Sequence, residues 1–466
     1  MNATDPISST KPTFALLTAL LLAPLVALAG DRNSVPPGTR SLRPVVRRFA
    51  ATLILAGSFL GANAAERGFT VAKDDSRWQI IAPSGKAVFL IGMNHLNDGS
   101  PADVGRRAYL DVADQRLRDW GLNNLGYGAP AELRGQMPFL LETRFTTGSQ
   151  FDEAGKFRYV DVFDAAFQTE VRRKVREVCA ASRDHPNLIG YYWTDTPRWD
   201  ITLARRLRGD DWVSTLRRLP STAAGKRAYV DFLRERYDND PARFTRAYGH
   251  AIASFDDLLL YDFREFDRDT PAGQADDRAF LGRIAAELYR VTGEAYRAHA
   301  PGRLIFGERY KLRDHPDEVL REAAKWIDVL SIQPGPSVGP RPGPGTDESE
   351  FDRAEFDRLH QLTGKPILIC DHRLSYRRPE FPVTLWHQFA TEQEAFDATR
   401  RFTLAAAARP YVIGYQHCQY RDSFSPERGN MLKPGLVRAD GTVGAVFDVG
   451  LPGLNKELAE THARSR

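Results

Sequence analysis

The sequence contains little cysteine and little net charge. Its 466 residues include three cysteines, Cys179, Cys370 and Cys418, which are too few for a disulfide framework. Cys370 and Cys418 fall on predicted strands, so we expect buried thiols, with a single bridge as the alternative. The formal net charge is +4 and the two signs are interleaved, so nothing favours a nucleic-acid partner. With 42% hydrophobic and 27% charged residues, the composition is that of a globular protein with ample core.

The sequence also lacks an apolar run long enough to indicate a membrane span. The second of two short apolar runs, Phe49–Leu60, follows several arginines and precedes Ala62-Asn63-Ala64, a pattern typical of a secretory signal peptide. We therefore expect a signal peptide at residues 43–64 and a secreted or periplasmic mature chain with no stable membrane span. The first run, Phe14–Ala29, is then an upstream extension or an anchor. Residues 1–65 are set apart as an N-terminal extension and signal region.

Beyond this region, apolar runs bounded by turn residues alternate with segments of helical periodicity. This alternation predicts an α/β fold, a (β/α)₈ TIM barrel, preceded by a short N-terminal β-hairpin at 69–82. An open doubly wound sheet is the alternative, but no Gly-rich phosphate loop follows the first strand. The eight predicted barrel strands are Val88–Gly92, Asn123–Tyr127, Phe139–Phe145, Leu188–Trp193, Leu304–Tyr310, Trp326–Gln333, Lys365–Asp371 and Val412–Tyr420.

The helical segments between these strands set the domain boundaries. We expect helices at Arg106–Trp120, Phe167–Ser182, Asp277–His299, Pro316–Ala324, Glu350–Leu362 and Thr391–Arg409. The last begins with a capping box of Thr391 and Glu394. Residues 200–275 are helical but interrupt the repeat, so we interpret them as an insertion after strand four, on the face where substrate would bind. The barrel domain is placed at 66–455 and a C-terminal tail at 456–466.

Polar side chains gather at the predicted C-terminal ends of the strands, where parallel barrels place their chemistry. They include Asn94, His95, Glu142, Arg144, Asp195, Thr196, Glu308, Arg309, Gln333, Asp371, His372, Gln416, His417, Gln419 and Asp422. Aromatic residues are dense nearby, namely Tyr127, Tyr191, Tyr192, Trp193, Trp199, Tyr310, Tyr376 and Tyr420. Carboxylates flanked by rings suit sugars, which offer hydroxyls to polar groups and C–H faces to rings.

These residues also have alternative roles. Glu142 with Arg144, and Glu308 with Arg309, can form structural ion pairs. A metal site of His95, His372 and His417 with acidic residues is a second alternative, because histidine and carboxylates are good ligands. The sequence contains neither His-x-His nor His-Glu-x-x-His spacing. We therefore expect no metal and no cofactor.

Several stretches together resemble the clan A glycoside hydrolases, and within them the beta-agarase-like (β/α)₈ barrel family. The likeness covers most of 68 to 455. The stretches are FLIGMNHL from Phe89, GYYWTDTPRW from Gly190, FLRERYDNDPARFTRAYG from Phe232, KPILICDH from Lys365 and ARPYVIGYQHCQYRD from Ala408. The resemblance implies an enzyme that cleaves O-glycosidic bonds in a polysaccharide or oligosaccharide.

The sequence departs from the family at both catalytic glutamates. When these stretches are aligned with the family's motifs, the Asn-Glu pair that carries the acid/base falls on Asp195 and Thr196. The nucleophile falls on Asp371. The usual tryptophan of strand eight falls on His417. Threonine cannot serve as a general acid. We therefore expect Asp371 to be the base or nucleophile, and Asp195 to be the acid, with Glu308 as the second choice.

The resemblance also implies a set of residues that bind the sugar. Hydroxyl-binding residues are expected at Asn94, His95, Thr196, Gln333, His372, His417 and Gln419, and stacking rings at Tyr192, Trp199 and Tyr420. Two other classes of function remain open: a catalytically inactive barrel that binds carbohydrate, which the loss of glutamate at Thr196 favours, and a metal-dependent hydrolase.

Overall fold

The chain divides into two units, Met1–Ala62 and Asn63–Arg466. The computed structural model describes residues 68–75, 77–97, 105–143, 159–193, 198–263, 270–334, 349–378, 384, 387–425 and 431–465, all within the second unit. The predicted signal peptide, residues 43–64, lies outside these ranges. Among the described residues, no helix combines the length and the apolar character that crossing a membrane requires.

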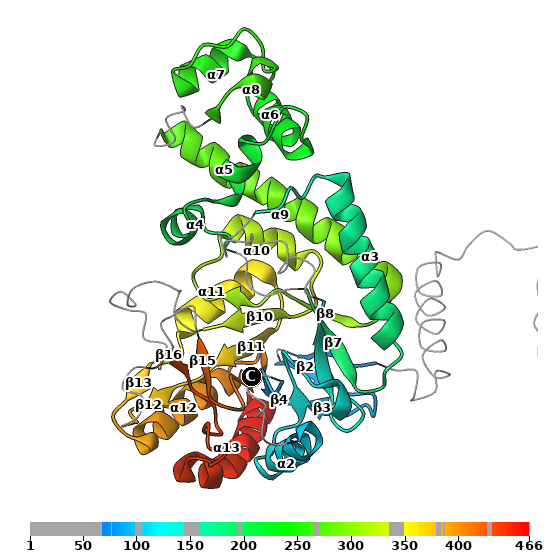
Figure 1. The fold of residues 1–466 in the computed structure, drawn as a ribbon, viewed down its shortest axis with the longest axis vertical. Helices are drawn as coiled ribbons and strands as arrows, with labels where there is room; N and C mark the ends of the chain where they lie inside the picture. Colours follow the sequence, from blue (N-terminus) through cyan, green and yellow to red (C-terminus); the bar gives the residue numbers. More distant parts are fainter. Residues whose placement is uncertain are drawn as a thin grey trace, which may run out of the picture. The chain divides into compact units, whose positions relative to one another are not determined.

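The centre of the second unit is a parallel sheet (Figure 1). Its strands are β4 (Leu90–Met93), β5 (Asn124–Leu125), β6 (Phe139–Glu142), β7 (Leu188–Tyr192), β8 (Leu304–Gly307), β9 (Tyr310–Lys311), β10 (Leu330–Gln333), β11 (Ile367–His372) and β14 (Val412–His417). Each corresponds to a predicted strand. The predicted fifth strand is divided into β8 and β9.

The order of the strands shows that the sheet closes into a barrel. It runs β8-β7-β6-β5-β4-β14-β11-β10-β9, so both edges belong to the fifth strand. The backbone N–H groups of Asp328 and Val329, just before β10, donate to Ile305 O in β8 at 2.8 and 3.2 Å. The (β/α)₈ prediction is therefore confirmed, and the open doubly wound alternative is wrong.

The predicted N-terminal hairpin is also present. β1 (Thr70–Asp74) pairs antiparallel with β2 (Arg77–Ile81), which pairs with β3 (Ala87–Val88). Phe69 and Ile80 belong to the same apolar cluster as barrel residues near the strand starts, such as Leu90 and Leu368. The hairpin thus packs on the N-terminal end of the barrel, which leaves the C-terminal end for a site.

Helices pack around the barrel and bury a continuous apolar layer against it. They are α2 (Arg106–Asp119), α3 (Ala165–Ser182), α9 (Pro271–His299), α10 (Asp317–Ala324), α11 (Arg353–Thr363), α12 (Glu392–Ala407) and α13 (Ala445–Arg464). The capping box of Thr391 and Glu394 is formed at the start of α12. α13 packs on α12, and the boundary that we placed at residue 455 falls inside α13.

Residues after β7 form a group of short helices at the predicted insertion (Figure 1). They are α4 (Ile201–Arg208), α5 (Trp212–Arg217), α6 (Ala224–Arg236), α7 (Pro241–Tyr248) and α8 (Asp257–Leu260). Two ion pairs join this group to α9, because Asp277 accepts from the partly exposed Arg205 and from the buried Arg217. The remaining short elements lie in loops: η1 (Ala131–Leu133), β12 (Ser375–Tyr376), β13 (Gln388–Phe389), β15 (Ser423–Ser425) and β16 (Met431–Lys433).

Candidate active site

Asp371 is a buried carboxylate at the C-terminal end of the barrel that residues from two other strands contact. It is only 2% exposed, and its backbone has a φ of 49°, in the left-handed region that non-glycine residues rarely adopt. Asn94, which follows β4, donates a 2.5 Å hydrogen bond from Nδ2 to Asp371 Oδ1. Arg309, between β8 and β9, forms an ion pair with Oδ2. The first and fifth strands therefore hold the carboxylate that the seventh strand supplies.

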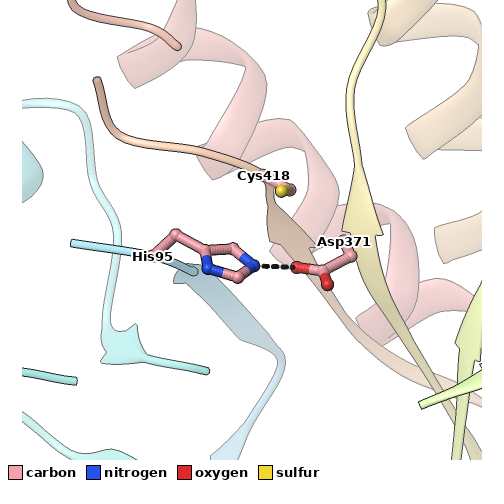
Figure 2. Close-up of side chains that lie close together, drawn as sticks. All are labelled: His95, Asp371 and Cys418. Atoms are coloured by element: carbon pink, nitrogen blue, oxygen red, sulfur yellow. Dashed lines mark ion pairs between the residues drawn. The ribbon is translucent and has the colours of Figure 1, made fainter. Parts of the chain in front are cut away.

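His95 completes this arrangement from the first strand. Figure 2 shows its imidazole directed at Asp371, with Nε2 lying 3.5 Å from Oδ1. The same nitrogen is 3.4 Å from an Arg309 guanidinium nitrogen. His95 also has a positive φ, 56°. Left-handed backbone at non-glycine residues costs about 1–3 kcal/mol each and clusters at functional sites, which favours a functional role for this end of the barrel.

Arg309 supplies the positive charge of the site. Its guanidinium lies 3.8 Å from the centroid of the Tyr127 ring, within the range of a cation–π interaction. The side chain is buried, so its charge is compensated by Asp371 rather than by water. The predicted pairing of Arg309 with Glu308 is wrong. Gly307 has a φ of 70°, which redirects the chain after β8, and Arg309 pairs with Asp371 instead.

A close approach of backbone and side chains holds Asn94 in place. Asn94 Oδ1 accepts from the backbone N–H of Tyr127 at 2.9 Å. A Cβ on Gly126 would overlap Asn94 and Gln416, so this position in the second strand requires glycine. Beneath this layer, Tyr192 OH lies 3.4 Å from Gln416 Oε1 inside the barrel.

Cys418, just after β14, lies beside His95 and Asp371 (Figure 2). Burial opposes ionisation of its thiol, but the positive charge of Lys433, the hydrogen bond and charge of His95, and the charge of Arg309 outweigh burial and lower the pKa to about 7. Cys179, Cys370 and Cys418 are all buried, and none of the three forms a disulfide. The buried thiols are confirmed, and the alternative of a bridge between Cys370 and Cys418 is wrong.

Glu308 faces a different set of residues. Trp199 Nε1 donates a 2.9 Å hydrogen bond to its Oε2, and His315 Nε2 lies 3.8 Å from the same oxygen. Burial raises the pKa of Glu308, while the nearby His315, the hydrogen bond from Trp199 and the nearby Tyr289 oppose that rise. Because Tyr289 belongs to α9 and Trp199 precedes α4, Glu308 is directed toward the helices, whereas Arg309 is directed at Asp371.

Two predicted hydroxyl-binding histidines lie away from the Asp371 carboxylate. His372 Nδ1 is 2.9 Å from Tyr415 OH, and its ring stacks on Phe402 of α12 at 4.1 Å. His417 is 2% exposed. Burial, with the positive charges of Arg373 and His372, lowers the pKa of His417 to about 3, so its ring is neutral. Among the described residues, the cluster of possible metal ligands that includes His95 contains Asp371 and Cys418 but neither His372 nor His417.

The predicted stacking rings are packed against protein. Trp199 stacks on Trp212 with ring centroids 4.3 Å apart, and Tyr192 is fully buried inside the barrel. Tyr420 lies 5.9 Å from the ring of Tyr109 and is 1% exposed. None of these three rings presents an open face in the structure.

The remaining predicted residues are placed as follows. Gln333 ends β10 and is 9% exposed. Gln419 Nε2 donates to Arg421 O and Ser423 Oγ, both at 2.7 Å. Asp195 and Thr196 lie outside the described residues. Of the expected site residues, the structure brings Asn94, His95 and Asp371 together.

Sequence reasoning missed the roles of three residues at this site. Arg309 was recognised as a strand-end residue but assigned to the wrong carboxylate. Tyr127 and Cys418 were read only as a nearby ring and a buried thiol. The signal that was available is position, because all three residues lie near the C-terminal ends of predicted strands. Their partners come from strands far apart in the sequence, so local pattern could not show which side chains meet.

Comparison with known proteins relates this geometry to solved barrels. No family model matches the chain. The chain is 24% identical over 265 residues to Beta-agarase A of Vibrio sp. (strain JT0107), a match that covers 53% of this chain and 26% of the relative. The chain thus spans about a quarter of that relative's length.

Solved structures match over nearly the whole chain. An agarase, AgWH50C, superposes with a TM-score of 0.70 at 16% identity, covering 92% of this chain and 72% of the agarase. The chain shares the barrel fold of that agarase. An exo-beta-agarase gives a TM-score of 0.70 at 15% identity, with 93% of this chain and 73% of that protein covered. At such identities the likeness establishes the fold and leaves the chemistry to be argued from the residues.

Proposed function

We propose that this chain is a glycoside hydrolase that cleaves O-glycosidic bonds in a polysaccharide or oligosaccharide. The observation that carries the proposal is the Asp371 carboxylate, buried at the C-terminal end of an agarase-like barrel and held by Asn94, His95 and Arg309. Active sites of such barrels lie at this end. The left-handed backbone of both Asp371 and His95 adds support, since strain of this kind is retained where function needs it.

Asp371 would act as the base or nucleophile. Arg309 neutralises the carboxylate in the resting protein and orients it through Oδ2, while Asn94 fixes Oδ1. Glycoside hydrolysis also needs an acid that protonates the leaving oxygen. Asp195 remains the expected acid, and Glu308 is the second choice because burial raises its pKa and so favours the protonated form.

We propose an agar-type polysaccharide as the first substrate to test. The support is the similarity to Beta-agarase A and the shared fold with two agarases. The binding residues proposed from the structure are Asn94 and His95, which contact Asp371, and Tyr127, whose ring lies against Arg309 and His95. Tyr127 supplies an aromatic side chain at this position, although one face of its ring is near Arg309.

A carbohydrate-binding barrel without activity is the second candidate. Two observations favour it. Both oxygens of the Asp371 carboxylate already have protein partners. The rings of Tyr192, Trp199 and Tyr420 are packed against protein. Under this alternative Asp371 would stabilise the C-terminal end of the barrel, and no glycosidic bond would be broken.

The two candidates are separated by measuring reducing-sugar release and binding on the same panel of marine and plant polysaccharides. The hydrolase proposal expects release from at least one polysaccharide, with agarose tested first. Asp371→Asn tests the proposed centre in the same assay. Asp184→Asn is its matched control, because the Asp184 side chain is 90% exposed and lies outside the site. Binding without release from any polysaccharide would support the second candidate, and neither binding nor release would overturn both.

We also propose that the protein is secreted or exported to the periplasm. Cleavage after the signal peptide, residues 43–64, would leave a mature chain that starts near Ala65. The support is the arginine-rich segment, the apolar run Phe49–Leu60 and the small residues that follow it. Expression of the full chain in a bacterial host, followed by N-terminal sequencing of the exported protein, should give a start near Ala65. Retention of the whole chain in the cytoplasm would contradict the proposal.

A further inference from the structure

The site contains three side chains of types that bind transition metals. One ligand atom from each of His95, Asp371 and Cys418 lies within 4.8 Å of the other two. All three residues are buried, with exposures of 8%, 2% and 1%. They come from the first, seventh and eighth strand ends, which adjoin in the closed sheet (Figure 2).

We propose that His95, Asp371 and Cys418 form a binding site for a thiophilic divalent cation, with Zn²⁺ as the representative ion. Imidazole nitrogen, carboxylate oxygen and thiolate sulfur are the ligands that zinc takes, and three protein ligands leave a fourth position open. With metal–ligand bonds of about 2.1 Å, two ligands of a tetrahedral site lie about 3.4 Å apart. The separation between His95 Nε2 and Asp371 Oδ1 is 3.5 Å.

Metal binding would keep both partners of the Asp371 carboxylate but would displace Arg309 from His95 Nε2, which lies 3.4 Å from a guanidinium nitrogen. Arg309 pairs with Oδ2, which leaves Oδ1 directed at His95. Asn94 donates to Oδ1, but a carboxylate oxygen has a second lone pair available for an ion. Arg309 and Asn94 would then orient the carboxylate from outside the ligand set, as such partners do in many metal sites.

The same contacts indicate that the ion is not needed for folding. Arg309 already compensates the buried charge of Asp371 when no ion is bound. Its positive charge also opposes a cation, so we expect reversible binding that depends on both negatively charged ligands, the carboxylate and the thiolate. This ligand set differs from the three-histidine alternative, because the cluster around His95 contains neither His372 nor His417.

A bound zinc ion would occupy the Asp371 carboxylate that the proposed hydrolysis needs, so we expect zinc to inhibit the enzyme. This consequence rests on the proposed function, whereas zinc binding itself does not. A protein that binds zinc at this site but hydrolyses nothing would refute the proposed function and leave the metal site standing.

The test is equilibrium dialysis of the full chain against Zn²⁺, with Co²⁺ as a spectroscopic probe of thiolate ligation. The parent should bind about one zinc ion per chain and show thiolate-to-cobalt charge-transfer absorption. Cys418→Ala should abolish that absorption and weaken zinc binding roughly tenfold or more. Cys179→Ala is the matched control, because Cys179 is an equally buried thiol without a disulfide. It belongs to α3 and packs in the apolar core.

The proposal is overturned if the parent binds no zinc, or if Cys418→Ala binds zinc as tightly as the parent does. His95→Gln provides an independent variant if Cys418→Ala fails to fold, and it should weaken binding to a similar degree. Equal loss in Cys179→Ala would also overturn the proposal, because binding would then depend on thiols in general.

Discussion

Asp371 and Glu308 are both buried carboxylates at strand ends of one barrel, and their surroundings differ in charge. Asp371 is compensated by the Arg309 guanidinium and receives a hydrogen bond from Asn94. Glu308 receives its 2.9 Å hydrogen bond from the neutral indole of Trp199, and the imidazole of His315 is 3.8 Å away. A buried carboxylate beside a permanent cation stays ionised, whereas one among neutral donors favours its protonated form.

This difference assigns the two residues to different kinds of chemistry. A base or nucleophile must be ionised, and a general acid must carry a proton at the working pH. Asp371 has the surroundings of the former, and burial raises the pKa of Glu308 in the direction that the latter needs. The contacts of Glu308 nevertheless come from α9 and the segment before α4, so the strand-end cluster around Asp371 is the better candidate for the reaction centre.

Removing the cation from the Asp371 side should have the largest effect on stability. Arg309→Met leaves a buried carboxylate without compensation, so the free energy of unfolding should fall by about 3–5 kcal/mol. Arg106→Met is the matched control, because the Arg106–Glu132 pair is exposed and such pairs contribute about 0–1 kcal/mol. Urea unfolding measures both, and equal losses in the two variants would show that Arg309 does not stabilise Asp371 as described.

Replacing the titratable carboxyl group of Glu308 should change the pH dependence of stability. The pKa of Glu308 is raised above its ordinary value of 4.5, so its folded form keeps a proton that the unfolded chain releases. This contribution to stability is complete below about pH 4.5 and is lost as the pH rises through the folded pKa. Glu308→Gln should therefore gain stability relative to the parent as the pH rises from 4.5. A difference between the two proteins that does not vary with pH would contradict this.

The smallest expected change comes from a single donor to Glu308. Trp199→Phe keeps an aromatic ring but removes the indole N–H, so it should cost about 1 kcal/mol of unfolding free energy. Because that hydrogen bond lowers the pKa of Glu308, its loss should raise the pKa further and steepen the pH dependence. Trp212→Phe is the control, since Trp212 Nε1 donates to the backbone oxygen of Val160. A change in pH dependence in both variants would count against a specific link to Glu308.

The barrel was predictable because its signals are local. The run Leu188–Trp193 is bounded by His-Pro-Asn and Pro, and β7 occupies Leu188–Tyr192. Thr391 and Glu394 form the predicted capping box. Eight predicted strands, most of them separated by helical segments, favour a closed parallel barrel, because that arrangement buries every strand.

The contacts of the site were only partly predictable, because they depend on backbone direction at the strand ends. A strand alternates its side chains between two faces, but Gly307, Asp371 and His95 all have positive φ and interrupt that alternation. Arg309 therefore meets Asp371, while its neighbour Glu308 meets Trp199. No pattern in the sequence reveals a left-handed aspartate or histidine in advance.

The most direct test of Asp371 as the reaction centre compares the rate of polysaccharide hydrolysis in the parent, Asp371→Asn and Asp184→Asn. Circular dichroism must first show that each protein is folded at the assay temperature, because Asp371→Asn leaves Arg309 unpaired. We predict that Asp371→Asn lowers the rate by roughly 10²–10⁴-fold, while Asp184→Asn matches the parent. A folded Asp371→Asn protein that hydrolyses the substrate at the parent's rate would contradict the account.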